Sequence, residues 1–147
     1  MIRKIATTMV FIAGLFSFIA GVKYLALSEF TAYHAVVVGK SWSQIEPGIQ
    51  SIILGMLTIV GSGYMATGLA ILFLLIPIRR GELWAYWATL AVTLANWIPV
   101  LYVTIALRRI NPAAETPVIP AVILIALLVF GIVLFFLDKT ISKNDKV

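Results

Sequence analysis

Long stretches of apolar residues dominate the chain, and polar residues gather in the short segments between them. Four stretches, 5–27, 49–78, 84–107 and 118–137, can each cross the roughly 30 Å hydrocarbon core of a bilayer, which takes about 20 helical residues. Backbone groups in lipid must hydrogen-bond within their own segment, so each stretch is predicted to be a helix. The pattern therefore predicts an all-α membrane fold, a four-transmembrane-helix bundle forming a single membrane domain over residues 1–147.

The composition indicates the same environment. Of the 147 residues, 62% are hydrophobic and 12% are charged, and the mean hydropathy of +1.07 excludes a water-soluble domain. Cysteine is absent from the sequence, which excludes a disulfide scaffold. The net charge of +5 does not indicate nucleic acid, because the basic residues lie at the ends of the spans, where anionic lipid headgroups attract them. The lipid bilayer is therefore the expected partner.

The basic residues also predict an orientation. One side carries seven Lys or Arg residues and the other carries three, namely Arg3, Lys4, Arg79, Arg80, Lys139, Lys143 and Lys146 against Lys40, Arg108 and Arg109. Cytoplasmic segments are enriched in basic residues, so both termini are predicted to be cytoplasmic in a bacterial inner membrane, although the Arg108–Arg109 pair argues the other way. The first stretch resembles a signal peptide but is longer than a typical h-region, and we interpret it as an uncleaved span.

The first loop, residues 28–48, is the longest connection and has a pattern of its own. Ser28 can begin a helix of about ten residues and Gly39 can end it. Its apolar face would combine Phe30, Tyr33, His34, Val37 and Val38. We expect a short interfacial helix that lies on the membrane surface or across the mouth of the bundle. Tyr24 and Tyr33 belong to an aromatic belt at this end, with anchoring as the first interpretation and stacking on a ligand as the second.

Small residues predict which helix faces approach each other in lipid. They recur on one face of each of the first three spans: Ala13, Ser17 and Gly21; Ser51, Gly55, Thr58, Ser62 and Ala66; Ala88, Ala91 and Ala95. The fourth span is bulky and has only Gly131 as a notch. We therefore expect the first three spans to form the tight core, and the fourth to pack loosely or to face lipid or a partner subunit.

The middle of the third span is a candidate for a pocket. Pro99 removes a backbone donor there, so a kink is expected. Thr89, Thr93 and Asn96 trace a polar face that runs up to the kink, and Trp97 lies beside it. These groups can line a small wet pocket, or they can hydrogen-bond across to neighbouring helices.

The single histidine, His34, is the second candidate. Together with Glu29 and Glu46 of the same loop, and Glu115 of the third loop, it can form an acid–base or metal group, or it can simply bond to headgroups or to a helix end. These residues show none of the repeated spacings that are typical of metal ligands, and one histidine cannot supply both axial ligands of a haem. No metal and no cofactor is therefore predicted. The candidate ligand-binding residues are His34, Glu29, Asn96 and Trp97.

Few residues suited to catalysis are present, and no catalytic residue is predicted. The sequence has no Cys, one His and no Asp before Asp138. This scarcity favours a protein that is not an enzyme, but it does not exclude an enzyme. The first hypothesis is a non-catalytic membrane protein, either a self-associating homo-oligomer or an accessory subunit of a larger membrane complex. The alternative is a small-molecule or lipid-binding protein, with or without an activity, whose pocket lies between the kinked third helix and the outer loop.

Three segments resemble those of small four-span bacterial inner-membrane proteins. They are Phe-Thr-Ala-Tyr-His-Ala at residues 30–35, the nearby Trp42, and Arg-Arg-Gly-Glu-Leu-Trp-Ala at residues 79–85. The resemblance covers most of the chain and implies the four-span architecture. Those proteins carry no assigned activity, so the resemblance implies no functional residues.

Overall fold

The computed structural model describes residues 2–144, and this range is almost entirely helical. Its elements in chain order are α1 (Ile2–Leu25), α2 (Ala32–Val38), a single 3-10 turn η1 (Trp42–Gln44), α3 (Pro47–Arg79), α4 (Leu83–Ile110) and α5 (Val118–Asn144). Helices α1, α3, α4 and α5 are long and apolar enough to cross a membrane. The predicted all-α fold with four spans is therefore confirmed, and the chain is a multi-pass membrane protein.

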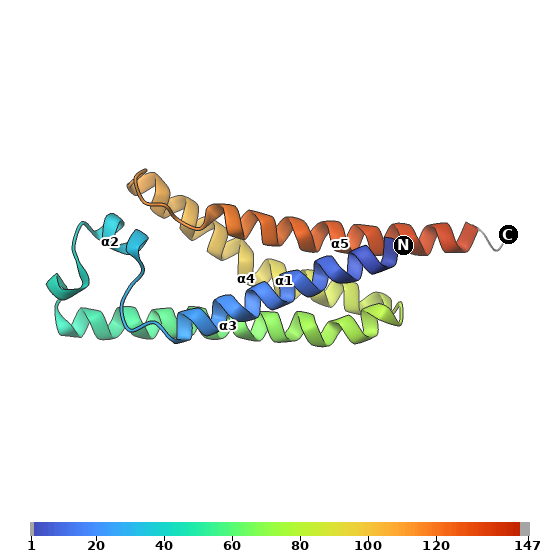
Figure 1. Cartoon of the computed structure of the whole chain (residues 1–147), viewed down its shortest axis with the longest axis horizontal. Coiled ribbons are helices and arrows are strands. Elements are labelled where there is room, and N and C mark those ends of the chain that lie inside the picture. The colour runs from blue at the N-terminus through green and yellow to red at the C-terminus, as the bar shows by residue number, and fades with distance from the viewer. Residues whose placement is uncertain (1, 145–147) are drawn as a thin grey trace.

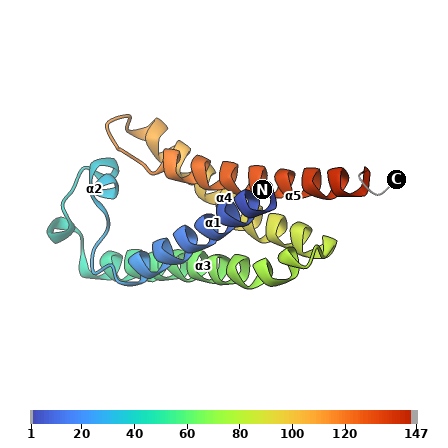
Figure 2. The same cartoon turned by 45° about the vertical axis from the view of Figure 1, so that its right-hand side comes forward.

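The four long helices form a closed bundle. Helix α1 packs against α3 on one side and against α5 on the other, and α4 completes the bundle by packing against α3 and α5 (Figure 1). The start of α1, the α3–α4 turn and the end of α5 lie at one end of the bundle, while α2 and η1 lie at the other (Figures 1 and 2).

Paired glycines bring α1 and α3 into close contact. Gly14 and Gly21 of α1 face Gly68 and Gly61 of α3, and a Cβ atom on Gly21 would lie only 2.4 Å from the backbone nitrogen of Met65. Lipid gives helices no hydrophobic reason to associate, so close backbone approach of this kind supplies the contact energy. The seven-residue spacing in both helices keeps the glycines on one seam.

The small-residue face predicted for α3 is wrong. Its five residues, Ser51, Gly55, Thr58, Ser62 and Ala66, are all exposed, and a Cβ on Gly55 would meet nothing within 4 Å. Each hydroxyl on this face bonds to a carbonyl one turn earlier in its own helix, at 2.9–3.0 Å. Because these groups are satisfied locally, lipid can cover them, whereas the face predicted for α1 is buried as expected.

The fourth span is packed more tightly than expected. Gly131 of α5 lies against α1, where a Cβ would come within 2.9 Å of Val10 Cγ2. Four large side chains of α5 are buried, namely Leu124, Leu128, Ile132 and Phe135. The single glycine notch is enough to admit Val10, so the expectation of a loosely packed fourth span is wrong.

Helix α4 buries threonines rather than its alanine stripe. Thr89 and Thr93 are buried, whereas Ala91 is exposed. The Thr89 hydroxyl donates to the Ala85 carbonyl at 2.8 Å, and the Thr93 hydroxyl donates to the Thr89 carbonyl at 2.7 Å. These two hydroxyls therefore donate within α4, and neither threonine lines a cavity described here.

The first loop folds over one end of the bundle. Helix α2 begins after Thr31 instead of Ser28, and it ends at Gly39, whose φ of 69° is the left-handed conformation that glycine adopts readily. The Asn111 amide at the end of α4 donates to the Val36 carbonyl of α2 at 2.9 Å. This bond holds α2 across the gap between α3 and α4.

Helix α3 is longer than its neighbour. Helix α1 ends beside Gly61, where a Cβ would lie 3.0 Å from the Leu25 nitrogen, so residues 47–57 of α3 run past the end of α1. At 1.5 Å per residue this overhang is about 15 Å long. Its outer surface carries exposed apolar side chains at Ile49, Ile52 and Met56.

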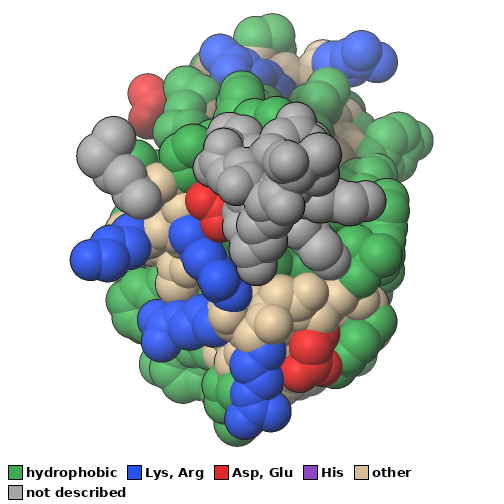
Figure 3. All heavy atoms as spheres, turned by 90° about the vertical axis from the view of Figure 1, so that its right-hand side faces the viewer, with side chains coloured by type: hydrophobic (Ala, Val, Ile, Leu, Met, Phe, Trp, Pro, Cys, Tyr) green, Lys and Arg blue, Asp and Glu red, His purple; other side chains and the backbone are tan. Residues whose placement is uncertain are grey.

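Basic side chains gather at the end of the bundle that carries the chain termini (Figure 3). The Arg3 guanidinium donates to the Arg79 carbonyl there, which ties the start of α1 to the end of α3. Lys146 and the side chains of Lys139 and Lys143 lie outside the described residues. The cytoplasmic placement of this end stays a prediction.

Candidate functional site

A cavity of about 430 Å³ lies between α3 and α4, at the end covered by α2. The two helices are close where a Cβ on Gly63 would lie 3.3 Å from Asn96 Oδ1, and they diverge from there toward α2 (Figures 1 and 2). Pro99 lines the cavity one turn beyond Asn96. Because proline has no N–H, the Ala95 carbonyl lacks its usual helical donor at this point.

The lining of this first cavity combines an apolar wall with a few neutral polar groups. The apolar part comes chiefly from Leu57, Ile59, Val60, Val100, Val103 and Leu107, and the polar part from Tyr24, Tyr33, His34, Tyr64, Asn96 and Thr104. None of the lining residues is Asp, Glu, Lys or Arg. Ile59 is 73% exposed and Val103 is 49% exposed although both line the cavity. The cavity therefore opens sideways, through the flank of the bundle.

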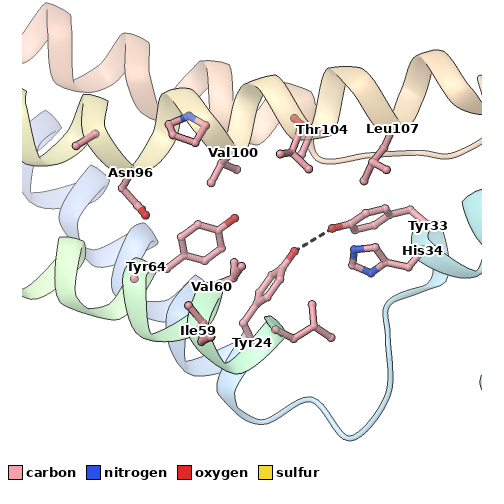
Figure 4. A pocket seen from close by; sticks show the side chains of 15 residues that line it. Tyr24, Tyr33, His34, Ile59, Val60, Tyr64, Asn96, Val100, Thr104 and Leu107 are labelled. Atoms are coloured by element: carbon pink, nitrogen blue, oxygen red, sulfur yellow. Dashed lines mark hydrogen bonds between the residues drawn. The ribbon is translucent and has the colours of Figure 1, made fainter. Parts of the chain in front are cut away.

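Three tyrosines form a wall along the cavity, from Tyr33 at the α2 end through Tyr24 to Tyr64 near Asn96 (Figure 4). The Tyr24 and Tyr33 hydroxyls are hydrogen-bonded at 3.1 Å, and the Tyr24 ring meets Tyr64 edge to face at 5.3 Å (Figure 4). Burial, with the hydrogen bond to Tyr24, raises the pKa of Tyr33 well above its ordinary value. Tyr33 is therefore a neutral phenol at physiological pH.

His34 lies beside Tyr33 at the same end (Figure 4). Its Nδ1 is 2.9 Å from the Thr31 hydroxyl, and its ring packs against Tyr33 with centroids 4.0 Å apart. Burial lowers the pKa of His34 below its usual 6.5, so the ring is neutral at pH 7. Within the described residues no group of three or more His, Cys, Asp or Glu comes together, so His34 has no companions for a metal site.

Asn96 lies at the opposite end of the cavity from His34 (Figure 4). Its Nδ2 is buried and has no hydrogen-bond partner among the described residues. A buried amide without a partner lowers stability by about 1–3 kcal/mol, so an acceptor that enters the cavity and reaches Nδ2 would be favoured.

The structure separates the four ligand-binding residues predicted from the sequence. His34 and Asn96 line the first cavity from opposite ends. Trp97 faces away from them and lines a second cavity, where it stacks on Tyr64 with centroids 4.8 Å apart. Glu29 is exposed and lines none of the cavities described here. The tyrosine wall was predicted only in part. Tyr24 and Tyr33 were expected first as anchors in an interfacial aromatic belt, and Tyr64 was not grouped with them.

The half-buried His34 predicts a pH-dependent stability. Its folded-state pKa is lower than that of the unfolded chain, so the unfolded chain binds the proton first as the pH falls. We expect the melting temperature in detergent to decrease from about pH 7 toward pH 5. A His34→Gln variant should lose less stability over this range, and equal losses in both proteins would contradict the assignment.

Searches of protein-family models, of curated proteins and of solved structures gave no match to this chain. The function is therefore inferred from the geometry of the site. The first cavity offers neutral donors and acceptors, apolar walls and a sideways opening, which suit reversible binding better than bond-breaking chemistry.

Proposed function

We propose that this protein binds an uncharged, lipid-soluble small molecule in the cavity between α3 and α4. The observation that carries this proposal is a cavity of about 430 Å³ whose lining contains no charged side chain. A charged ligand would lose its hydration without gaining a counter-ion there, whereas a neutral apolar molecule would lose little. Binding of a small molecule is the function that this geometry supports best.

The sideways opening supports entry from the bilayer. Exposed Ile59 and Val103 line the opening, so a lipid-soluble molecule can move from the hydrocarbon into the cavity without crossing water. Helix α2 lies across the end of the bundle and is held there by the Asn111 amide. The ligand would therefore come from the leaflet on the α2 side.

Polar groups at the two ends of the cavity can orient the ligand. The unpartnered Asn96 amide supplies a donor at the end away from α2, and the Tyr33 phenol and the His34 ring supply neutral hydrogen-bonding groups at the other. A carbonyl or ether oxygen that meets Asn96 would satisfy a buried donor that the protein leaves unpaired. The favoured ligand is thus a neutral amphipathic molecule with at least one such acceptor.

Asn96→Leu tests this assignment with two readouts of opposite sign. The substitution removes an unpaired buried amide, so we expect the melting temperature of the ligand-free protein to stay level or to rise. We also expect retention of the co-purified ligand to fall about three- to tenfold, the value of one neutral hydrogen bond. Native mass spectrometry of protein released from its membrane by mild detergent measures the bound fraction.

A cavity-filling pair supplies the control. Val103→Trp places a large ring in the opening, whereas Val133→Trp places it on a similarly exposed part of α5 that lines no described cavity. The first variant should lose the bound molecule and the second should keep it. Wild-type protein that carries no small molecule, or equal retention by both variants, would refute the proposal.

Self-association and membership of a larger complex, which the sequence also predicts, stay predictions. The small-residue face of α3, which was expected to pack inside the bundle, points outward, but its hydroxyls bond within their own helix and need no partner. For this reason we favour ligand binding over the assembly hypothesis.

A further inference from the structure

A second cavity, of about 390 Å³, lies on the other side of the tyrosine wall. Tyr24, Tyr33 and Tyr64 line both cavities, so the wall separates them. The second cavity is bounded by α1, by α4 at Trp97 and by the segment that leads into α5. Unlike the first cavity, it contains charged residues.

The two charged residues of this cavity have opposite signs. Lys23 projects from the last part of α1, and Glu115 comes from the connection between α4 and α5. No salt bridge joins them among the described residues, although both also line an adjoining hollow beside α2. Their ammonium and carboxylate groups are therefore both available to a ligand that carries one charge of each sign.

An apolar groove adjoins this cavity along the bundle. The groove has a volume of about 280 Å³, lies between α1 and α5, and is lined only by apolar side chains. Phe16 and Pro120 line both the groove and the charged cavity, so the two lie side by side. Ile123 and Ile12, further along the groove, are 53% and 47% exposed, so the groove is open toward lipid.

We propose that this second cavity holds the headgroup of an ethanolamine-type phospholipid, with its phosphate at Lys23, its ammonium at Glu115 and an acyl chain in the groove between α1 and α5. Charge complementarity favours a zwitterion, because an anionic headgroup without an ammonium group would bring a second negative charge near the exposed Glu115 carboxylate with nothing to offset the repulsion. The adjoining apolar groove favours a lipid over a free phosphoethanolamine, because it offers an acyl chain a place beside the headgroup. This site is separate from the cavity of the proposed function and takes a ligand of different charge.

Lipid competition measured by native mass spectrometry tests the proposal. The purified protein is exchanged into an equimolar mixture of phosphatidylethanolamine and phosphatidylglycerol, and the lipids that stay bound are counted. We expect the wild type to retain phosphatidylethanolamine about tenfold more than phosphatidylglycerol. Glu115→Gln should abolish that preference, and Lys23→Gln should reduce retention of both lipids, whereas Lys23→Arg should keep it.

Matched variants exclude a general effect of charge. Lys40→Gln and Glu29→Gln make the same charge changes at exposed loop positions outside the cavity, and both should behave as wild type. Equal retention of the two lipids by the wild type, or a Glu115→Gln variant with an unchanged preference, would overturn the proposal. Displacement of the lipid by free phosphoethanolamine at equal concentration would overturn the lipid assignment, because the groove would then contribute nothing.

Discussion

Gly68→Ala is expected to lower the free energy of unfolding by about 1–3 kcal/mol, the usual effect of forcing an extra group into a packed interface. The new Cβ would lie 2.4 Å from the Phe18 nitrogen and 2.7 Å from the Gly14 carbonyl oxygen. Both contacts are to backbone, so no side-chain rotation can relieve them and α1 has to move away from α3. Reversible unfolding in mixed micelles, followed by circular dichroism, measures the change.

Gly55→Ala is the matched control in the same helix. A Cβ at Gly55 meets nothing within 4 Å, and alanine is a better helix former than glycine. This variant should be as stable as the wild type or more stable, by up to about 1 kcal/mol. If the two alanine variants unfold at the same point, the glycine seam between α1 and α3 is wrongly placed.

Trp97→Ala is expected to destabilise the protein by about 3–5 kcal/mol, as truncation of a large buried aromatic side chain usually does. The ring is 4% exposed, stacks on Tyr64 and donates its N–H to Ser17 Oγ at 3.3 Å. It thereby connects α4 with both α3 and α1 at the centre of the bundle. The same unfolding measurement in micelles reports the loss.

Two further tryptophan variants separate packing from hydrogen bonding. Trp97→Phe keeps an aromatic ring against Tyr64 but loses the N–H and part of the indole volume, while Ser17 still donates to the Tyr64 carbonyl, so we expect a loss of about 1–3 kcal/mol. Trp84 is 58% exposed, and Trp84→Ala should change stability by less than about 1 kcal/mol. A large loss in Trp84→Ala with little in Trp97→Ala would contradict the buried position of Trp97.

The sequence was sufficient to predict the spans and the packing face of α1, but not the faces by which α3 and α4 pack. Length and hydropathy determine whether a segment can cross a bilayer, and both are local properties. Helix α3 carries small residues on several faces, since successive residues such as Gly61 and Ser62 point about 100° apart on a helix. Only the partner selects among those faces, and the glycines at seven-residue spacing in α1 match Gly61 and Gly68 rather than the outer stripe.

The candidate site was predictable to a similar degree. Asn96 and His34 are distinctive because they are polar or ionisable residues in or beside apolar segments, and the structure places both in one cavity. Lys23 and Glu115 are more than ninety positions apart in the sequence, and nothing local indicates that they line the same cavity. Their proximity depends on how the α4–α5 connection returns beside α1, which is a property of the tertiary fold.

The overhang of α3 makes the bundle taller on one flank than on the other. Lipids beside Ile49, Ile52 and Met56 meet an apolar wall that continues about 15 Å beyond the end of α1. Hydrocarbon adjusts its thickness to the protein surface that it touches, so the bilayer should be locally thickened along α3 and thinner along α1. Such a step would strain the leaflet beside the opening through which the ligand would enter.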